Sequence, residues 1–301
     1  MTDLSWLPNL FIAGAPKAGT SSLHQWLADH PDALGSVEKE TYYFVDPGTH
    51  MYRREAHIAN GLDGWRDQFP RHAGKAPKVI VESTPANLYY QAALAHIPEL
   101  PSSPKCVFIL REPGAQIHSL YTYFRDNWDW IPAKMNFAEF LAAVRDGNHD
   151  FKGNELAKNA IKYARYVDYL KPWHEKLGDE RMLVKTFETL LNDRVGLTKM
   201  IASWTGLDPD FYDTYDFPRE NETYTPKNRA LQSVNVKVRG LLPKGKVYSK
   251  IRNLYRRLNT QQGRVMTESD DALVKELGLE FASSNRELAL HFKLDLDRWP
   301  T

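Results

Sequence analysis

The chain has 301 residues, of which 42% are hydrophobic and 26% charged, and its formal net charge is +1. This composition is typical of a globular protein, and the length is sufficient to bury a core. No run of about 18 apolar residues predicts a membrane span, and the single cysteine, Cys106, excludes an internal disulfide and a cysteine-rich zinc site. Because the first strand candidate begins by Leu10, no signal peptide fits before it, and we expect a cytoplasmic protein.

The first predicted unit is a strand, a glycine-rich loop and a helix between residues 9 and 27. Residues 10–13 form an apolar run long enough for a buried strand and too short for a core helix. Two glycines and a proline then break regular structure over residues 14–19, and the hydroxyl residues Thr20, Ser21 and Ser22 are expected to cap the following helix. This layout is typical of phosphate binding, since backbone N–H groups and the helix N-terminus both attract an anion.

The rest of the chain alternates short strands with helices. Residues 36–46 are expected to form a strand or loop, residues 46–72 an excursion with helices, and residues 208–225 a long loop. The predicted further strands are 78–81, 105–110 and 181–187, and the predicted helices are 87–97, from 113 onward, 137–144, 156–176, 195–204 and 268–290. This alternation predicts an α/β, P-loop-like three-layer fold, with a central, mainly parallel sheet flanked by helices and one domain over residues 1–301.

The loop departs from that of nucleotide triphosphatases in one position. Those loops place a lysine directly after the second glycine, whereas here Thr20 follows Gly19 and the lysine, Lys17, lies inside the loop. The pattern P-K-x-G-T-[ST]-[ST]-L resembles the 5′-phosphosulfate loop of sulfotransferases that use 3′-phosphoadenosine 5′-phosphosulfate (PAPS). The resemblance implies that the donor phosphosulfate is held by the loop and the first helical turn, that is by Lys17, Ala18, Gly19, Thr20, Ser21 and Ser22.

A second motif lies at the end of the predicted strand 105–110. Arg111-Glu112-Pro113 follows the strand, and Ser119 comes two helical turns later. An arginine at a strand end and a hydroxyl on the next helix can share one phosphate, because the guanidinium makes bidentate contacts. The segment is similar to the strand–R-[DE]-P–helix–S pattern of the same family, which implies that Arg111 and Ser119 bind the 3′-phosphate.

The candidate base is Glu40. The segment Lys39-Glu40-Thr41-Tyr42-Tyr43-Phe44 resembles the K-E-x-x-[FY]-F segment in which glycan sulfotransferases place a catalytic glutamate, and a carboxylate there can remove the acceptor proton. The alternative is a surface ion pair of Glu40 with a lysine, or a histidine base at position 24, 50 or 118. The chain has Ser83 where the heparan-sulfate-type branch has a lysine, and Lys39 or a residue of the basic segment is a possible substitute.

A basic segment lies near the C-terminal end. Residues 223–267 contain eleven lysines and arginines and no acidic residue, which suggests an anionic partner or a solvated basic face. The family resemblance makes this segment a lid or insertion over the cofactor or acceptor site, with Lys227 and Arg229 as cofactor contacts. It matches no nucleic-acid-binding motif and lacks regular aromatic interleaving, so we expect no nucleic-acid partner.

The chain therefore resembles the PAPS-dependent sulfotransferases, in motif style the carbohydrate (heparan-sulfate-type) enzymes, and is expected to be a soluble bacterial member. The resemblance implies in-line transfer of the sulfuryl group to a hydroxyl on a glycan or glycolipid, with adenosine 3′,5′-bisphosphate as product and no metal. It also implies that Glu40 is the general base and that Lys17 offsets the charge that develops on the bridging oxygen. Two alternatives remain at this point. One is a nucleoside-triphosphate-dependent kinase on the same loop architecture, and the other is a non-enzymatic basic protein that binds anions.

Overall fold

The structure is a computed structural model that describes residues 4–70, 76–218, 224–226, 260–262 and 266–301. Its centre is a parallel five-stranded sheet with the strand order β2-β3-β1-β4-β5. The strands are β1 (Leu10–Gly14), β2 (Ala33–Gly35), β3 (Val79–Glu82), β4 (Lys105–Leu110) and β5 (Met182–Thr186). The predicted α/β fold with a central parallel sheet is confirmed.

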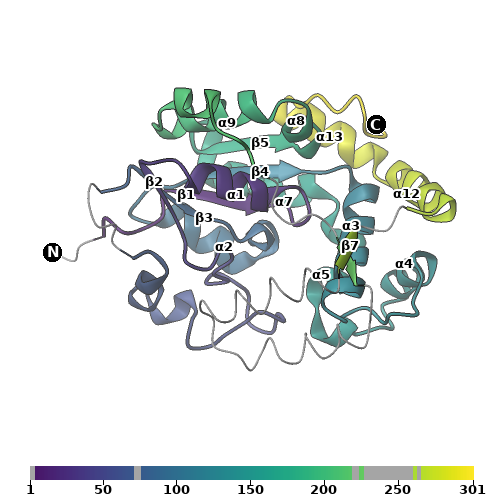
Figure 1. Ribbon diagram of the computed structural model, residues 1–301. Helices are drawn as coiled ribbons and strands as arrows, with labels where there is room; N and C mark the ends of the chain where they lie inside the picture. Colours follow the sequence, from purple (N-terminus) through teal and green to yellow (C-terminus); the bar gives the residue numbers. More distant parts are fainter. Residues whose placement is uncertain (1–3, 71–75, 219–223, 227–259, 263–265) are drawn as a thin grey trace.

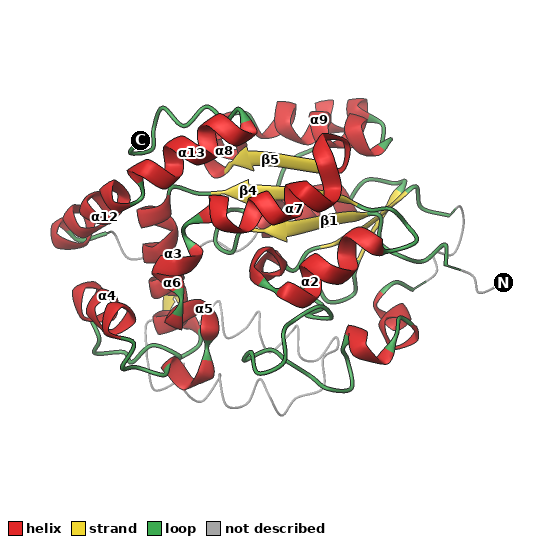
Figure 2. Ribbon diagram, turned by 180° about the vertical axis from the view of Figure 1, so that it is seen from behind, coloured by secondary structure: helices red, strands yellow, loops and turns green. Residues whose placement is uncertain are grey.

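Helices cover both faces of this sheet. Figure 1 shows α1 in front of the strands, and Figure 2 shows α2 and α7 over the opposite face. The α-helices are α1 (Thr20–Ala28), α2 (Gln91–His96), α3 (Pro113–Asn127), α4 (Phe137–Asp146), α5 (Glu155–Lys158), α6 (Ala160–Tyr163), α7 (Tyr166–Arg181), α8 (Phe187–Asn192), α9 (Arg194–Thr205), α12 (Glu268–Glu280) and α13 (Ala282–Phe292). The short 3-10 helices are η1 (Ile58–Asn60), η2 (Asp63–Gln68), η3 (Pro85–Tyr89), η4 (Ile97–Glu99), η5 (Phe151–Gly153) and η6 (Pro209–Asp213).

Two hydrophobic cores lie on the two faces of the sheet, and the strand sequences explain both. Side chains alternate across a strand, so Leu10 and Ile12 of β1 pack with α1 and α9, whereas Phe11 belongs to the larger aromatic core on the α3 and α7 side. The central strands β1, β3 and β4 are apolar on both faces because both faces are covered.

Three predicted helices are not continuous in the structure. The expected helix 156–176 is three helices, because Asn154 caps α5 and the backbone leaves helical geometry at Asn159 and Arg165. The expected helix 268–290 is divided into α12 and α13 at Phe281. The segment expected to be a helix over 87–97 contains η3, α2 and η4, of which only α2 is α-helical.

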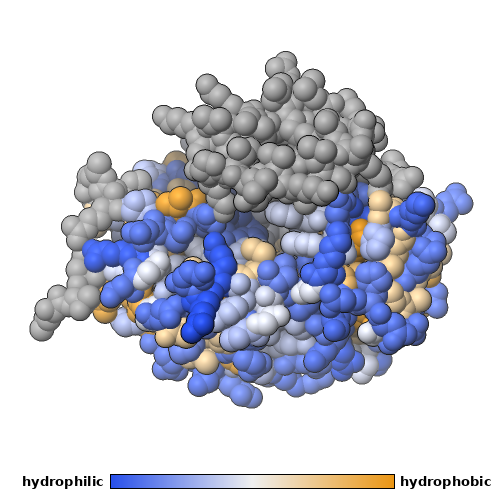
Figure 3. All heavy atoms as spheres, turned by 90° about the horizontal axis from the view of Figure 1, so that it is seen from below, coloured by the Kyte–Doolittle hydropathy of each residue, from blue (hydrophilic) through white to orange (hydrophobic). Residues whose placement is uncertain are grey.

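The described ends of the basic segment form a small ribbon. Strand β6 (Tyr224–Pro226) pairs antiparallel with β7 (Thr260–Gln262), so the chain before and after residues 227–259 is joined at one place, and α3 lies beside β6. On the face that Figure 3 shows, the described side chains are mainly hydrophilic, with small scattered hydrophobic patches. Across the described ranges, no helix has the length and apolar character that a bilayer crossing requires.

Candidate functional site

The glycine loop lies between β1 and α1 and requires its glycines. Gly19 has φ +81°, and a Cβ there would lie 2.9 Å from side-chain atoms of Phe187 and Leu190. Gly19, and not a hydroxyl residue, is the N-cap of α1, so Thr20, Ser21 and Ser22 lie in the first helical turn and the expected hydroxyl cap is wrong. No side chain caps this helix, so the N–H groups at its start that make no backbone bond are available to an anion bound at the loop.

Arg111 brings the two predicted halves of the site together. It follows β4, and its Nη1 donates a hydrogen bond of 3.3 Å to the backbone carbonyl of Lys17. Its guanidinium lies 5.0 Å from the ring centre of Phe187, and the Tyr166 hydroxyl donates to the Arg111 carbonyl at 3.0 Å. Arg111 is thus fixed from both sides next to the glycine loop.

Lys17 is held in an unfavourable environment for a cation. Burial, followed by the nearby charge of Arg111, lowers the pKa of Lys17 to about 8. Burial also lowers the pKa of Arg111. Among the described residues, no carboxylate lies within ion-pair distance of either side chain. The charges of Glu40, near Lys17, and of Glu188 and Glu112, near Arg111, favour the two cations without forming an ion pair with them. Two partly desolvated cations that form no ion pair favour an anionic ligand, because desolvating a charge is costly.

One face of α3 lies along the glycine loop. The Gln116 side-chain amide donates to the Pro16 carbonyl at 3.1 Å, and the Lys17 ammonium lies 3.9 Å from the centre of the Tyr123 ring. Residues 116, 119 and 123 share one helix face, so Ser119 lies between these two contacts on the side that faces the loop. Helix geometry therefore puts Ser119 on the same side of α3 as the contacts to Pro16 and Lys17.

Glu40 is close enough to Lys17 for their charges to interact. Lys39 Nζ lies 2.8 Å from Glu40 Oε1, and the Tyr42 hydroxyl donates to Oε2. Burial alone would raise the pKa of Glu40, but the charge and hydrogen bond of Lys39, the Tyr42 hydroxyl and the charge of Lys17 together lower it. Glu40 is therefore a carboxylate at neutral pH, which is the form that can accept a proton.

A second carboxylate, Glu82 at the end of β3, orders the segment that carries Glu40. It is fully buried and accepts hydrogen bonds from the backbone N–H groups and hydroxyls of Thr41 and Thr84. The Asn87 side-chain amide also donates to it at 3.4 Å. Burial raises the pKa of Glu82. Glu82 therefore has a structural role, since both of its carboxylate oxygens already accept hydrogen bonds from the protein.

The structure also shows the surroundings of Ser83, the position at which the heparan-sulfate-type branch has a lysine, and of the three candidate histidines. Ser83 is fully buried, and its hydroxyl lies 2.7 Å from Nδ1 of His24. Burial lowers the pKa of His24 to about 3. His118 lies against Asp270 of α12, and His50 lies against Glu155. Of these candidate bases, only Glu40 has an electrostatic contact with Lys17.

Sequence reasoning missed two tyrosines that shape the site. Tyr42 bonds to Glu40, and Tyr123 stacks on Lys17. Spacing gave a signal for Tyr123, which is four residues after Ser119 on a helix. It gave none for the contact of Tyr42 with Glu40, because Tyr42 has φ +52°, a left-handed conformation that the sequence does not predict for a tyrosine. Lys227 and Arg229, the predicted basic contacts, lie outside the described residues.

A family model described as "Sulfotransferase family" matches residues 8–211, which include the loop, Glu40, Arg111 and Ser119. The chain belongs to the sulfotransferase family. This membership makes it an enzyme and favours the sulfotransferase prediction over the kinase and the non-enzymatic alternatives.

Similar proteins include carbohydrate sulfotransferases. The mouse heparan sulfate glucosamine 3-O-sulfotransferase 3B1 is 28% identical over 223 residues, covering 70% of this chain and 51% of that protein. The mouse bifunctional heparan sulfate N-deacetylase/N-sulfotransferase 4 is 20% identical over 210 residues, covering 68% of this chain and 23% of that protein. The chain thus spans about half, or less, of the length of these relatives. A sulfotransferase structure from Alicyclobacillus acidocaldarius has a TM-score of 0.66 at 19% identity and covers 98% of this chain and 99% of that chain, which shows a shared fold.

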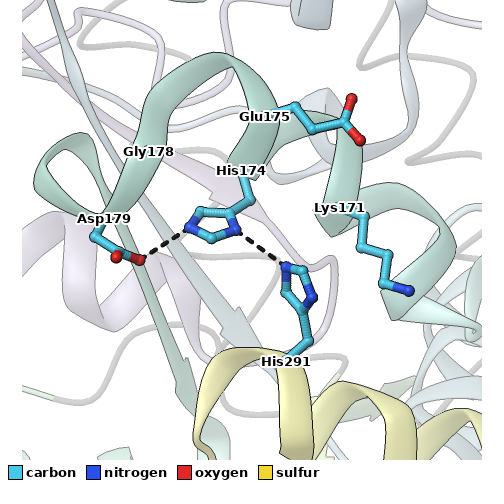
Figure 4. A pocket seen from close by; sticks show the side chains of 6 residues that line it. All are labelled: Lys171, His174, Glu175, Gly178, Asp179 and His291. Atoms are coloured by element: carbon cyan, nitrogen blue, oxygen red, sulfur yellow. Dashed lines mark hydrogen bonds and ion pairs between the residues drawn. The ribbon is translucent and has the colours of Figure 1, made fainter.

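A further pocket of this sulfotransferase, of about 530 Å³, lies on α7 and α13 and is not lined by the loop, Arg111 or Glu40. His174 occupies its centre (Figure 4), with Nδ1 lying 3.0 Å from His291 Nε2 and Nε2 lying 2.9 Å from Asp179 Oδ1. Because both ring nitrogens of His174 are already engaged, this cluster is a contact between helices. Among the residues that the structure describes, no group of three or more His, Cys, Asp or Glu could hold a metal ion.

Proposed function

We propose that this sulfotransferase moves the sulfuryl group of PAPS to a hydroxyl of a carbohydrate or glycolipid, with Glu40 as general base. The observation that carries the proposal is the meeting of Lys17, Arg111 and the uncapped N-terminus of α1, tied together by the hydrogen bond from Arg111 to the Lys17 carbonyl. Two desolvated cations and a free helix N-terminus fit a ligand with two separate phosphate groups. The relatives named for heparan sulfate support a sugar acceptor.

In this proposal the loop and the start of α1 hold the 5′-phosphosulfate. Lys17, Ala18, Gly19, Thr20, Ser21 and Ser22 contribute backbone N–H groups, hydroxyls and one ammonium group. Arg111 and Ser119 hold the 3′-phosphate from the neighbouring strand end and helix. Lys227 and Arg229 remain predicted contacts to the same phosphate, on a part of the chain outside the described residues.

Bound PAPS supplies a sulfuryl group on a phosphate leaving group, and the protein residues prepare both ends of the transfer. Glu40 accepts the proton of the acceptor hydroxyl as the new oxygen–sulfur bond forms. Lys17 would offset the negative charge that develops on the bridging oxygen when the oxygen–sulfur bond to the phosphate breaks, and such preorganised electrostatics is usually a large part of catalysis. This chain has Ser83 where the heparan-sulfate-type branch has a lysine. Lys39 is the proposed replacement, because it is hydrogen-bonded to Glu40 and its charge interacts with that of Lys17.

The test is a calorimetric titration with adenosine 3′,5′-bisphosphate in the absence of metal, compared with ATP and magnesium. We expect binding of the bisphosphate that falls at least about tenfold in Arg111→Ala, because a charged hydrogen-bonded contact is worth roughly 1.5–3 kcal/mol. A preference for ATP with magnesium would refute the donor assignment and favour a kinase. Binding that is equal in wild type and Arg111→Ala would refute the role of Arg111.

We also propose that residues 1–301 form one domain and that the protein is cytoplasmic. The single central sheet supports the first proposal, since the segments on both sides of it pack on the same strands. Limited proteolysis tests it: two stable fragments that fold separately would contradict a single domain.

A further inference from the structure

The backbone of Lys17 is held on two sides by side chains that follow β4. The Gln116 side-chain amide donates to the Pro16 carbonyl, directly before Lys17, at 3.1 Å. Arg111 Nη1 donates to the carbonyl of Lys17 itself at 3.3 Å. Both peptide groups that flank the Lys17 Cα therefore have a side-chain donor, and both donors come from one short segment, residues 111–116, that leads from β4 into α3.

Lys17 needs this support because its backbone is left-handed. Its φ is +66°, a conformation that is unfavourable for a residue with a long side chain and persists only where the surroundings enforce it. The loop is also fixed on either side of this point, since the Ala15 N–H donates to the Ile109 carbonyl at 2.7 Å and Ala18 is fully buried. The two side-chain hydrogen bonds act on the part of the loop between these fixed points.

The same helix also contacts the Lys17 side chain. The ammonium nitrogen lies 3.9 Å from the centre of the Tyr123 ring. Tyr123 comes seven residues after Gln116 in α3, which is about two helical turns, so one face of the helix carries both residues. A movement of the loop relative to α3 would therefore change the backbone contact and the ammonium contact of Lys17 together.

Stability does not account for an amide at position 116. Gln116 is only 2% exposed, and within the described ranges no donor contacts its Oε1. The Pro16 carbonyl fixes which end of the amide is the nitrogen, because only an N–H group can donate to it. A buried polar atom without a partner lowers stability, so an apolar side chain of the same size would fold as well or better. The contact with the glycine loop is what the amide contributes.

We propose that Gln116 is a positioning residue that holds Lys17 in the conformation in which its ammonium binds the 5′-phosphosulfate of the donor. This inference rests on the proposed function, in which Lys17 binds that group. Gln116 does not touch the donor and acts through the Pro16 carbonyl. Its effect should therefore concern the 5′ end of the donor, which the loop holds, and not the 3′-phosphate, which is assigned to Arg111 and Ser119.

The first test titrates Lys17 in the full chain without any ligand. Brief acetylation at a series of pH values, with each lysine quantified by mass spectrometry, gives the pH at which each amine loses its proton. Burial lowers the pKa of Lys17 to about 8 in the wild type. Gln116→Met has a similar size and cannot donate to the loop, so Lys17 should regain contact with solvent and its pKa should rise toward 10.5.

Two further variants accompany this titration. Gln116→Asn keeps an amide that is one methylene too short for the Pro16 carbonyl, so it should raise the pKa of Lys17 in the same direction. It also provides the result if Gln116→Met does not fold. Gln91→Met, at an exposed glutamine of α2, is the matched control and should leave the pKa of Lys17 unchanged.

The second test compares two nucleotides by calorimetry. Adenosine 3′,5′-bisphosphate carries one phosphate for the loop and one for Arg111, whereas adenosine 3′-monophosphate lacks the first. We expect Gln116→Met to lower the affinity for the bisphosphate about three- to tenfold and to leave the affinity for the monophosphate unchanged. Arg111→Ala should lower both affinities. The midpoint of urea unfolding of Gln116→Met should equal or exceed that of the wild type.

An unchanged pKa of Lys17 in both Gln116 variants would overturn the proposal. An equal loss of affinity for the two nucleotides would also overturn it, because the amide would then support the site as a whole. A lower urea midpoint with unchanged bisphosphate binding would show a purely structural role. If the wild type binds neither nucleotide, the proposed function fails, and the acetylation test still decides whether Gln116 positions Lys17.

Discussion

Replacing Lys17 by methionine should stabilise the protein while removing its donor binding. Lys17 is a half-buried cation whose pKa is lowered to about 8 by burial and by Arg111. A pKa lowered from 10.5 to about 8 corresponds to a cost of about 3 kcal/mol for the charged form at pH 7. Loss of the cation–π contact with Tyr123 offsets about 1 kcal/mol of this. We therefore expect Lys17→Met to raise the free energy of unfolding by about 2 kcal/mol at pH 7.

The sign of the pH dependence follows from the direction of the pKa change. Below pH 8 Lys17 is charged in both the folded and the unfolded states, so the full cost is present in the wild type. Between pH 8 and 10.5 the folded state loses its proton first, and the stability of the wild type rises with pH relative to the variant. The advantage of Lys17→Met should therefore shrink over this window.

Urea unfolding followed by circular dichroism at pH 7 and pH 10 measures both effects. Lys176→Met, at an exposed lysine of α7, is the matched control and should change stability by less than about 0.5 kcal/mol. A Lys17→Met variant that is less stable than wild type at pH 7 would refute the reasoning. So would a gain in stability that is the same at both pH values.

Two further predictions concern Glu40. Glu40→Gln should fold and bind adenosine 3′,5′-bisphosphate like the wild type, but its turnover should fall by about 10²–10⁴ because a general base is lost; unchanged turnover in steady-state assays would remove Glu40 as the base. Tyr42→Phe removes a hydrogen bond that lowers the pKa of Glu40, so the acidic limb of the profile of kcat/KM against pH should move to higher pH. A limb that moves to lower pH, or not at all, would show that Glu40 does not control that limb.

The strands β1, β3, β4 and β5 and the glycine loop were predictable because their signals are local, whereas the three-residue strand β2 was missed. The strand 105–110 was predicted with its observed bounds, since a short run that is apolar on both faces, followed by Arg-Glu-Pro, admits few other structures. The start of α3 at Pro113 was predicted for the same kind of reason, because proline fits the first helical position.

The helix breaks were predictable only in part. Asn154 accepts a hydrogen bond from the Ala157 N–H and begins α5, and such a cap is visible in a sequence. The division of α12 from α13 falls at Phe281, without glycine or proline, where the apolar periodicity continues across the break. Tertiary packing determines that break, which periodicity cannot show.

The site was predictable in its residue types and not in its contacts. Lys17, Glu40, Arg111 and Ser119 were proposed from motifs and remain predicted site residues, but the sequence could not show that Tyr123 lies under Lys17. That contact joins segments more than 100 residues apart in the chain. Local spacing placed Tyr123 on the correct helix face, and only the packing of α3 against the loop brought the ring to the ammonium group.

The two carboxylates near the site show how environment assigns their roles. Glu82 is buried among five hydrogen-bond donors and its pKa is raised, whereas Glu40 is half-buried beside Lys39 and its pKa is lowered. Paired groups with pKa values moved in opposite directions commonly have different functions. Glu82 holds Thr41, the neighbour of Glu40 in the chain, and has no oxygen to spare for an acceptor. Glu40 remains ionised, and each of its oxygens has one side-chain donor, from Lys39 and from Tyr42, so each has a lone pair left for the hydroxyl of an acceptor. Glu82 therefore positions the segment, and Glu40 is the one of the two that fits the proposed role of base.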